Sequence, residues 1–417
     1  MPSIHSAVIY SPSFTEGQRQ LLNRDIAGIG LFKRLVLTLQ RAGLHKIVIL
    51  SGDIPEKDCS RMEKDIHNDS RFKAKMLFVN QENLEKQEGR DRIDEFISGP
   101  GFLLTGINMI TNARLIHEFL DAAQKSGSLD RGKIAALQAS SKETGGMYLL
   151  PAEKLKVLQN YSRNPGFEES VEPIHLKGPG LFWEEVEDAG SARSAEAELI
   201  KSHRYSYTQF MDIWFNSFLS APISSFLVKT PATPNQVTLF GLVIGLMAGW
   251  CFSLGNHFGE IVGALFLAAT AVWDCCDGEV ARLKFMESDF GETLDTACDN
   301  IINVFIFTGM GIGVAKQYGM AYAAIPFFLL ALGGGLIFYL IYFPKEGKGS
   351  FFKGTWAYKA IQILASRNFI YIIFLFAVFG RLDAFLWLAG FGSMIFALAL
   401  YVTKQNIHRI GEDAPGS

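Results

Sequence analysis

The stretch WDCCDGEVARLKFMESDFGETLDTACDN, residues 273–300, decides the architecture of this protein. It places four carboxylates, those of Asp274, Asp277, Asp295 and Asp299, on the two sides of one short turn. The spacings i, i+3 and i, i+4 put each pair of aspartates along one face of a helix. We therefore expect two antiparallel neighbouring helices that bring the two pairs together.

The sequence on both sides of this stretch is strongly apolar. Hydrophobic residues make up 49% of the chain and charged residues only 19%. Since a bilayer core needs about 20 helical residues, the second, third and fifth apolar stretches must extend into flanking polar sequence. The sequence thus predicts an all-α domain of six membrane-spanning helices, with the aspartates near the membrane surface. The six stretches are Val237–Leu254, Ile261–Trp273, Ile301–Ala315, Ala321–Phe343, Phe369–Gly380 and Ala384–Thr403.

The four carboxylates predict a cation site. At a membrane boundary they would repel one another and lose hydration, at a cost of several kcal/mol. Oxygen ligands select hard ions such as Mg²⁺, Mn²⁺ or Ca²⁺, and the absence of a nearby His argues against zinc. We expect two divalent ions here.

Small residues and one arginine surround the carboxylates in the sequence. Gly278, Ala281 and Gly291 lack bulk, so a ligand or a facing helix can approach the backbone closely. Arg282 offers a planar fork for phosphate oxygens, and the alternative is an anchor at the cytoplasmic surface. A lone aspartate in such a helix is often only a cap or a helix–helix hydrogen bond, but four in register favour a binding site.

The charge distribution predicts the orientation in the membrane. The chain begins with Met1, Pro2 and Ser3 and shows no basic segment followed by an apolar core, so we expect no cleavable signal peptide. We expect a multi-pass protein of the cell membrane, with its N-terminal domain and the acidic site facing the cytoplasm. Positive-inside bias supports this orientation. The loop after the fourth stretch carries Lys345, Lys348, Lys353, Lys359 and Arg367, whereas the opposite side offers only Lys316 and Arg381.

Residues 1–200 have the pattern of a cytoplasmic α/β domain. An amphipathic helix is expected over Leu31–Ala42 and a short helix over Ala192–Lys201, with residues 163–190 as an irregular return between the sheet and that helix. Four buried strands predict a parallel sheet. They are Ser6–Tyr10, Lys46–Leu50, Lys75–Val79 and Phe102–Thr105.

A linker follows this domain. Tyr207–Val228 alternates aromatic and aliphatic residues with polar ones, which favours an amphipathic helix at the membrane interface. We therefore divide the chain into the α/β domain at 1–200, the linker and interfacial helix at 201–236, the membrane domain at 237–404 and a cytoplasmic tail at 405–417.

The acidic stretch matches a family signature. Every fixed position of D-x2-D-G-x2-A-R-x8-G-x3-D-x3-D is present, and the chain here resembles the CDP-alcohol phosphotransferase family of integral membrane enzymes. The resemblance extends upstream, because the segments around Asn216 and Ser220 and around Thr233–Thr238 look like the family's interfacial helix and the start of its first span.

The resemblance implies an activity and a role for each residue. It implies transfer of a phosphoalcohol group from a CDP-alcohol donor to an acceptor alcohol, with release of CMP, by a homodimer in the lipid bilayer. Two divalent ions, Mg²⁺ or Mn²⁺, would be bound by Asp274, Asp277, Asp295 and Asp299, and Asp299 would also act as the general base. The nucleotide side would be formed by Gly278, Ala281, Arg282, Gly291 and Asn235.

Arg367 is a candidate for the acceptor side. It precedes the fifth apolar stretch, where it either binds an acceptor phosphate or anchors the helix at the interface.

The N-terminal domain is weakly similar to nucleotidyltransferases that make CDP-activated alcohols. Where those enzymes carry a glycine-rich phosphate loop, this chain has Tyr10–Phe14 and one glycine, Gly17. Their metal-binding Gly-Asp step is Gly106-Ile107 here, and their Asp-Val-Asp segment becomes Glu185–Glu187. A triphosphate needs backbone donors and an acidic ligand for its magnesium. We therefore expect an α/β domain that keeps the sheet and has lost nucleotidyl transfer.

Three readings of the function compete. The leading one is the phosphotransferase, and the second is a bifunctional enzyme with an active N-terminal cytidylyltransferase. The third is a cation transporter, which the clustering of the acids at one cytoplasmic end disfavours. A formal charge of −3 gives no net attraction to nucleic acid, and no such partner is expected.

Overall fold

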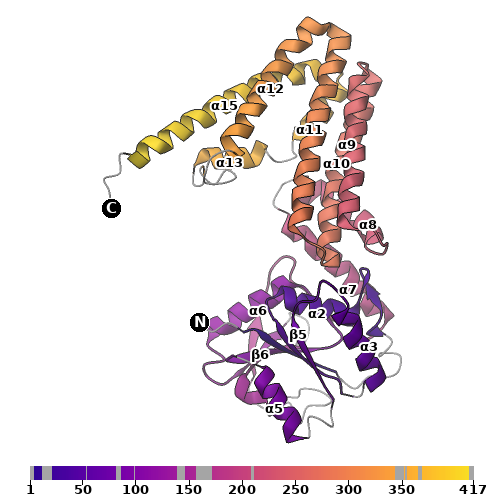
Figure 1. Cartoon of the computed structure of the whole chain (residues 1–417), viewed down its shortest axis with the longest axis vertical. Helices are drawn as coiled ribbons and strands as arrows, with labels where there is room; N and C mark the ends of the chain where they lie inside the picture. Colours follow the sequence, from indigo (N-terminus) through magenta and orange to yellow (C-terminus); the bar gives the residue numbers. More distant parts are fainter. Residues whose placement is uncertain are drawn as a thin grey trace. The chain divides into compact units, whose positions relative to one another are not determined.

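The computed structural model of the 417-residue chain describes most of its length (Figure 1). The described residues are 4–11, 21–52, 54–80, 86–97, 99–138, 146–155, 171–207, 211–342, 352, 355–364 and 369–412. The chain divides into two compact units. The first unit consists of Met1–Thr208, Ser225–Pro231 and Arg282–Met286, and the second contains the remaining residues.

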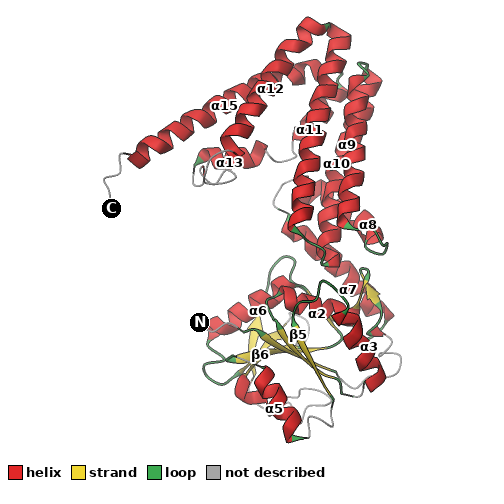
Figure 2. Ribbon diagram, viewed as in Figure 1, coloured by secondary structure: helices red, strands yellow, loops and turns green. Residues whose placement is uncertain are grey.

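The first unit is built on a seven-stranded sheet whose order is β10-β8-β9-β6-β1-β4-β5 (Figure 2). All neighbouring strands pair in parallel except β9, which runs antiparallel to β6 and β8. The four strands expected from the sequence are present and parallel to one another. The strand bounds are β1 Ser6–Tyr10, β4 Lys46–Leu50, β5 Lys75–Val79, β6 Gly101–Gly106, β8 Ile134–Gln138, β9 Met147–Pro151 and β10 Val171–His175.

Helices accompany this sheet because their apolar faces need burial. The first of them, α2 (Leu31–Arg41), buries eight of its 11 residues, and its predicted bounds are confirmed to within one residue. Asn112 caps α6 by accepting a hydrogen bond from the Leu115 amide at 2.9 Å. The other helices of this unit are α3 Glu56–His67, α5 Gln87–Phe96, α6 Ala113–Ser126 and α7 Ala189–Ser202.

The predicted irregular return at 163–190 is wrong where its described part forms two short strands. Strand β10 adds to one edge of the large sheet beside β8, and β11 (Trp183–Glu185) pairs with β7 (Met109–Thr111). The residue Pro173 lowers the strand signal in the sequence, yet an edge strand tolerates proline because one side of it needs no partner. The hydrophobic pattern of the sequence therefore did not predict these short strands, which contain charged residues.

The second unit is helical. A π-helical turn, Asp212–Asn216, leads into α8 (Ser217–Leu227), in place of one continuous predicted helix over 207–228. Longer helices follow: α9 Pro234–Ser253, α10 His257–Lys284, α11 Asp289–Tyr318, α12 Met320–Tyr342 and α15 Leu382–Glu412. Two shorter ones, α13 (Trp356–Leu364) and α14 (Phe369–Val378), lie between α12 and α15 in the sequence.

Five of these helices are long and apolar enough to cross a membrane, namely α9, α10, α11, α12 and α15. The expected extension of the second and third stretches into polar sequence is present, since α10 has 28 residues and α11 has 30. The fifth expected span corresponds to α14, whose ten described residues are fewer than a bilayer core needs. The sequence analysis did not predict α13.

Close packing of α9 against α11 fixes one side of the helical unit. A Cβ atom added at Gly309 would collide with the backbone carbonyl oxygen of Gly249, so two glycines allow the two backbones to touch. Residues of α9, α10, α11, α14 and α15 share one buried cluster, which includes Phe252, Leu267 and Ile373. This packing holds the aspartate-bearing helices in place.

Candidate active site

The aspartates of α10 and α11 converge, as the spacing predicted. A carboxylate oxygen from each of Asp274, Asp277 and Asp295 lies within 4.8 Å of the other two. Asp299, one helical turn after Asp295, lines the same cavity. Asp277 is the most enclosed of the three clustered groups, with 8% of its surface exposed.

Helix α9 orients one of these carboxylates. The Thr238 hydroxyl donates to Asp277 Oδ2 at 2.7 Å and also lies 3.2 Å from the Pro234 carbonyl oxygen. A capping box fixes the start of α9. The Thr233 hydroxyl oxygen accepts a hydrogen bond from the Gln236 backbone amide, and the Gln236 side-chain oxygen accepts one from the Thr233 backbone amide. The Pro-Asn start of the helix therefore places Thr238 one turn into α9, facing the acidic cluster.

A cavity of about 280 Å³ opens beside the aspartates. Its walls are mixed, since Leu242, Leu267 and Ile302 are apolar whereas the carboxylates, Thr270 and Asn303 are polar. A site of this kind accommodates a ligand with one charged end and one less polar end.

The sequence analysis missed a polar chain at this cavity. Asp212, in the π-helical turn, lines the cavity and is 8% exposed. Asn216 Nδ2 donates to Asp212 Oδ1 at 2.8 Å, and the Tyr371 hydroxyl donates to Asn216 Oδ1 at 2.5 Å. The i, i+4 spacing of Asp212 and Asn216 on an otherwise apolar segment was a signal, but only the folded chain shows that α14 supplies the tyrosine.

The residues expected on the nucleotide side take several positions. An added Cβ at Gly291 would lie 3.3 Å from Asn235 Oδ1, so these two residues, 56 positions apart in sequence, are neighbours. Gly278 and Ala281 follow Asp277 on α10, and Arg282 belongs to the first unit. Among the described residues, none of these five lines the cavity itself. Arg367 lies outside the described residues.

The donor set suits a divalent cation. Three carboxylate oxygens at this separation would repel one another without a compensating charge, and all of them are hard ligands. Cys298 also lines the cavity, but its sulfur is not needed to complete the oxygen set. The cluster can therefore hold a hard divalent ion of the Mg²⁺ or Mn²⁺ type.

Comparisons with known proteins find a family match in the helical part. Residues 231–402 match the sequence model of the CDP-alcohol phosphatidyltransferase family. The "Bifunctional IPC transferase and DIPP synthase" of Aquifex aeolicus is 25% identical over 228 residues, which cover 54% of this chain and 51% of that protein. The match thus spans about half of the relative's length. The "Archaetidylinositol phosphate synthase" of Pyrococcus horikoshii is 29% identical over 189 residues, covering 44% of this chain and 90% of that one.

The first unit has structural neighbours of another kind. The crystal structure of 4-diphosphocytidyl-2C-methyl-D-erythritol synthase from Anaerococcus prevotii covers 47% of this chain and 96% of its own, at 11% identity and a TM-score of 0.34. Such a likeness concerns the fold alone. The match to the CDP-alcohol phosphatidyltransferase family covers residues 231–402, which include the whole acidic signature and the helices that carry it.

Proposed function

We propose that this protein transfers a phosphoalcohol group from a CDP-alcohol to an acceptor alcohol with release of CMP, in the synthesis of a lipid. The observation that carries the proposal is the convergence of carboxylate oxygens from Asp274, Asp277 and Asp295 within 4.8 Å, beside a cavity in a membrane-type helical unit. The family of residues 231–402 supports the same reaction class.

We assign the metal ligands to the four aspartates of the signature. Asp274, Asp277, Asp295 and Asp299 would hold two divalent ions, Mg²⁺ or Mn²⁺, which when bound neutralise charge on the diphosphate and on the departing CMP. Thr238 keeps Asp277 in one orientation, so that α10 and α11 present their carboxylates without rearrangement.

The remaining roles are proposed from the chemistry of the residues and from the family match. Asp299 accepts the proton of the attacking hydroxyl, because it lines the cavity where the acceptor must enter. Gly278, Ala281, Gly291, Asn235 and Arg282 form the nucleotide side of the site, where small residues admit the ligand and the guanidinium pairs with phosphate. Arg367 is proposed as a ligand of an acceptor phosphate.

The arrangement in the cell is part of the same proposal. We propose a homodimer in the cell membrane, with the active site and residues 1–200 on the cytoplasmic side. Residues 201–236 form the linker and interfacial helix, 237–404 the membrane domain, and 405–417 the cytoplasmic tail.

Two donor–acceptor pairs are compatible with this chemistry, and one assay separates them. We expect the purified chain in detergent micelles to release CMP from either CDP-diacylglycerol with a phosphorylated polyol or CDP-inositol with an inositol phosphate or lipid acceptor. The names of the relatives, which include an archaetidylinositol phosphate synthase, favour inositol-containing substrates. The Asp274→Asn variant, assayed in the same way, gives the background rate of CMP release. No CMP above this background with any pair would contradict the proposed activity.

The first unit is proposed to be catalytically silent toward CTP. Ile107 has no exposed surface, and the neighbouring Asn108 side chain donates to the Val186 carbonyl oxygen at 3.3 Å, so Gly106–Asn108 offers no acidic ligand for magnesium. The glycine-poor loop at residues 12–20 lies outside the described residues.

A test with CTP addresses the bifunctional alternative. Incubation of the full chain with CTP, Mg²⁺ and inositol 1-phosphate should yield no pyrophosphate above background, because residues 10–18 contain a single glycine, Gly17, and Gly106–Asn108 contains no acidic ligand for the metal of a triphosphate. A genuine cytidylyltransferase assayed in parallel provides the positive control. Stoichiometric pyrophosphate from this chain would establish the bifunctional reading instead.

A further inference from the structure

The last three residues of α10, Arg282–Lys284, belong to the first unit. The last four carbonyl groups of a helix have no partner inside the helix, and they carry the negative end of its dipole. Helix α10 ends at Lys284, and the last three of these groups belong to the return segment, Arg282–Met286, which is part of the first unit. We therefore look for the hydrogen-bond donors of these carbonyl groups within the first unit.

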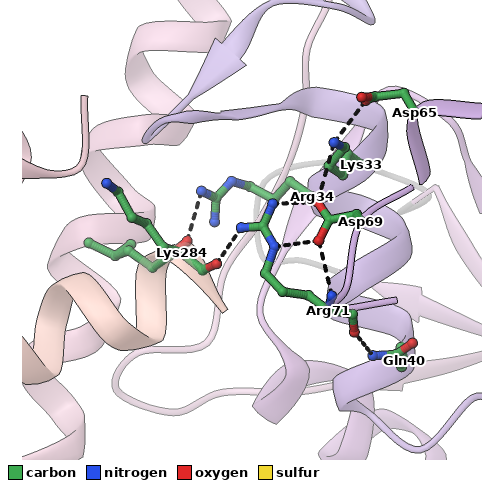
Figure 3. A network of polar contacts seen from close by, with 8 residues as sticks. Lys33, Arg34, Gln40, Asp65, Asp69, Arg71 and Lys284 are labelled. Atoms are coloured by element: carbon green, nitrogen blue, oxygen red, sulfur yellow. Dashed lines mark hydrogen bonds and ion pairs between the residues drawn. The ribbon is translucent and has the colours of Figure 1, made fainter. Parts of the chain in front are cut away.

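Three arginines of the first unit donate to three successive carbonyls of the return segment. Arg41 Nη1 lies 3.1 Å from the Arg282 carbonyl oxygen, and Arg34 Nη2 lies 3.0 Å from that of Leu283. Arg71 Nη1 lies 2.6 Å from the Lys284 carbonyl oxygen (Figure 3). Cationic donors at a helix C-terminus are favourable twice, as hydrogen bonds and as charges opposed to the dipole.

Two of the arginines, Arg34 and Arg71, are themselves held in place. Arg34 is 2% exposed and also donates to the carbonyl oxygens of Ile26 at 2.9 Å and Ala27 at 3.0 Å. Figure 3 shows Arg71 between Lys284 and Asp69, with both Asp69 oxygens accepting bonds from it, at 2.7 and 2.5 Å. This fork lowers the pKa of Asp69 to about 2, so the pair stays charged at neutral pH. The donors are thus preorganised.

An aromatic residue completes the contact. Phe285 has φ 55°, a left-handed conformation that is uncommon for a side chain of this size. Its ring lies under two of the guanidinium groups, 4.2 Å from that of Arg41 and 5.6 Å from that of Arg34. Two cation–π contacts therefore offset the strain of the turn and keep the ring beside the arginines.

A second segment of the chain is tied to the same surface. Val228 is 1% exposed, and a Cβ atom added at Gly28, which has φ 76°, would collide with its carbonyl oxygen. Lys229 pairs with Glu196 at 3.1 Å, and Lys284 Nζ donates to the Thr230 carbonyl oxygen at 2.6 Å. The first unit thus holds both the approach to α9 and the end of α10.

Positive charge is concentrated around the return segment. Burial lowers the pKa of His203 to about 3, and Arg282, Arg41 and Arg34 add to the effect, so the imidazole is neutral at pH 7. Bringing several buried positive charges together costs desolvation and repulsion energy, and such charges need compensating partners. The backbone carbonyl groups at the C-terminal end of α10 are these partners.

We propose that the first unit acts as a clamp on the return segment, in which Arg34, Arg41 and Arg71 are positioning residues for the nucleotide side of the phosphotransferase site. The inference rests on the proposed function, since the clamped turn contains Arg282 and directly follows Ala281. Fraying of this turn would release both residues first, whereas Asp277 and Asp274 lie about one and two turns further into α10 than Ala281 and would keep their places. The clamp therefore acts on affinity for the nucleotide more than on the chemical step.

The test removes two of the three guanidinium groups in the full chain. In Arg41→Met/Arg71→Met, we expect amide hydrogen exchange in residues 282–286 to rise at least about 10-fold, because two carbonyl caps are lost. The Kd of CDP, measured with Mg²⁺ present, should rise roughly 5- to 10-fold while kcat for CMP release stays within about 2-fold. Arg41→Lys/Arg71→Lys retains one cationic donor at each position and should restore much of the affinity.

The matched control is Arg114→Met/Arg131→Met, which removes two exposed arginines from the same unit. If amide hydrogen exchange in residues 282–286 is unchanged in Arg41→Met/Arg71→Met, the clamp proposal is wrong, whether or not the chain turns over a CDP-alcohol. Faster exchange with an unchanged Kd of CDP would reduce the arginines to a structural role and overturn the positioning proposal. If the unaltered chain neither binds CDP nor releases CMP, the proposed function fails, and the exchange comparison still decides whether the arginines hold the segment.

Discussion

Replacing Asp299 with Asn should lower CMP release at least about 1,000-fold, because the amide cannot accept a proton from the acceptor hydroxyl. Asp299 is the aspartate of the signature that lies outside the tight group of Asp274, Asp277 and Asp295. Its loss should therefore leave CDP binding in the presence of Mg²⁺ within about 3-fold. Asp277→Asn should lower both turnover and CDP affinity, since it removes a central metal ligand. Steady-state rates and titration calorimetry on the two variants measure the contrast.

Asp289→Asn provides the control for this experiment. Asp289 is an exposed acid in the first turn of the same helix, α11, so its replacement changes the same charge without entering the cavity. Its rate and CDP affinity should match those of the unaltered chain. Equal losses of turnover and of CDP affinity in Asp299→Asn and Asp277→Asn would contradict the division between base and metal ligand.

Chelation should have an equally large effect. Excess EDTA should reduce CMP release to less than about 1% of its starting value, because the clustered carboxylates are hard oxygen ligands for the divalent ions that the proposed reaction requires. Readdition of Mg²⁺ or Mn²⁺ beyond the chelator should restore the rate, whereas Zn²⁺ should not, since the cluster offers hard oxygen ligands.

Metal binding can be measured without turnover. Titration with Mn²⁺, followed by electron paramagnetic resonance, should show about two ions per chain, and Asp274→Asn should lose at least one of them. Full activity in excess EDTA, or the absence of any Mn²⁺ bound to the unaltered chain, would refute the two-ion proposal.

The proposed clamp gives the first unit a role that does not depend on nucleotidyl transfer. The arginines of the clamp come from α2 and from the turn after α3. A glycine-poor loop and a buried Ile107 are then compatible with a unit that remains necessary.

Local pattern was sufficient for a large part of this protein. The four central strands and α2 followed from runs of buried residues, because burial on both faces of a parallel sheet needs an unbroken apolar run. The acidic cluster followed from i, i+3 and i, i+4 spacing on two helices joined by one turn, since neighbours in sequence can only fold back on each other. In each case the interacting residues lie close together in the sequence or share one period.

Tertiary structure decided the remaining features, because their partners are distant in sequence. The edge strand β10 is stabilised by pairing with β8 and not by its own composition, which includes Pro173. Tyr371 reaches Asn216 across 155 positions, and Arg34 reaches Leu283 across 249. The periodicity of the sequence does not predict such pairs, because they form only when elements that are distant in sequence come together in the folded chain. The sequence by itself therefore determined where the carboxylates gather, and only the fold decided which side chains hold the turn beside them.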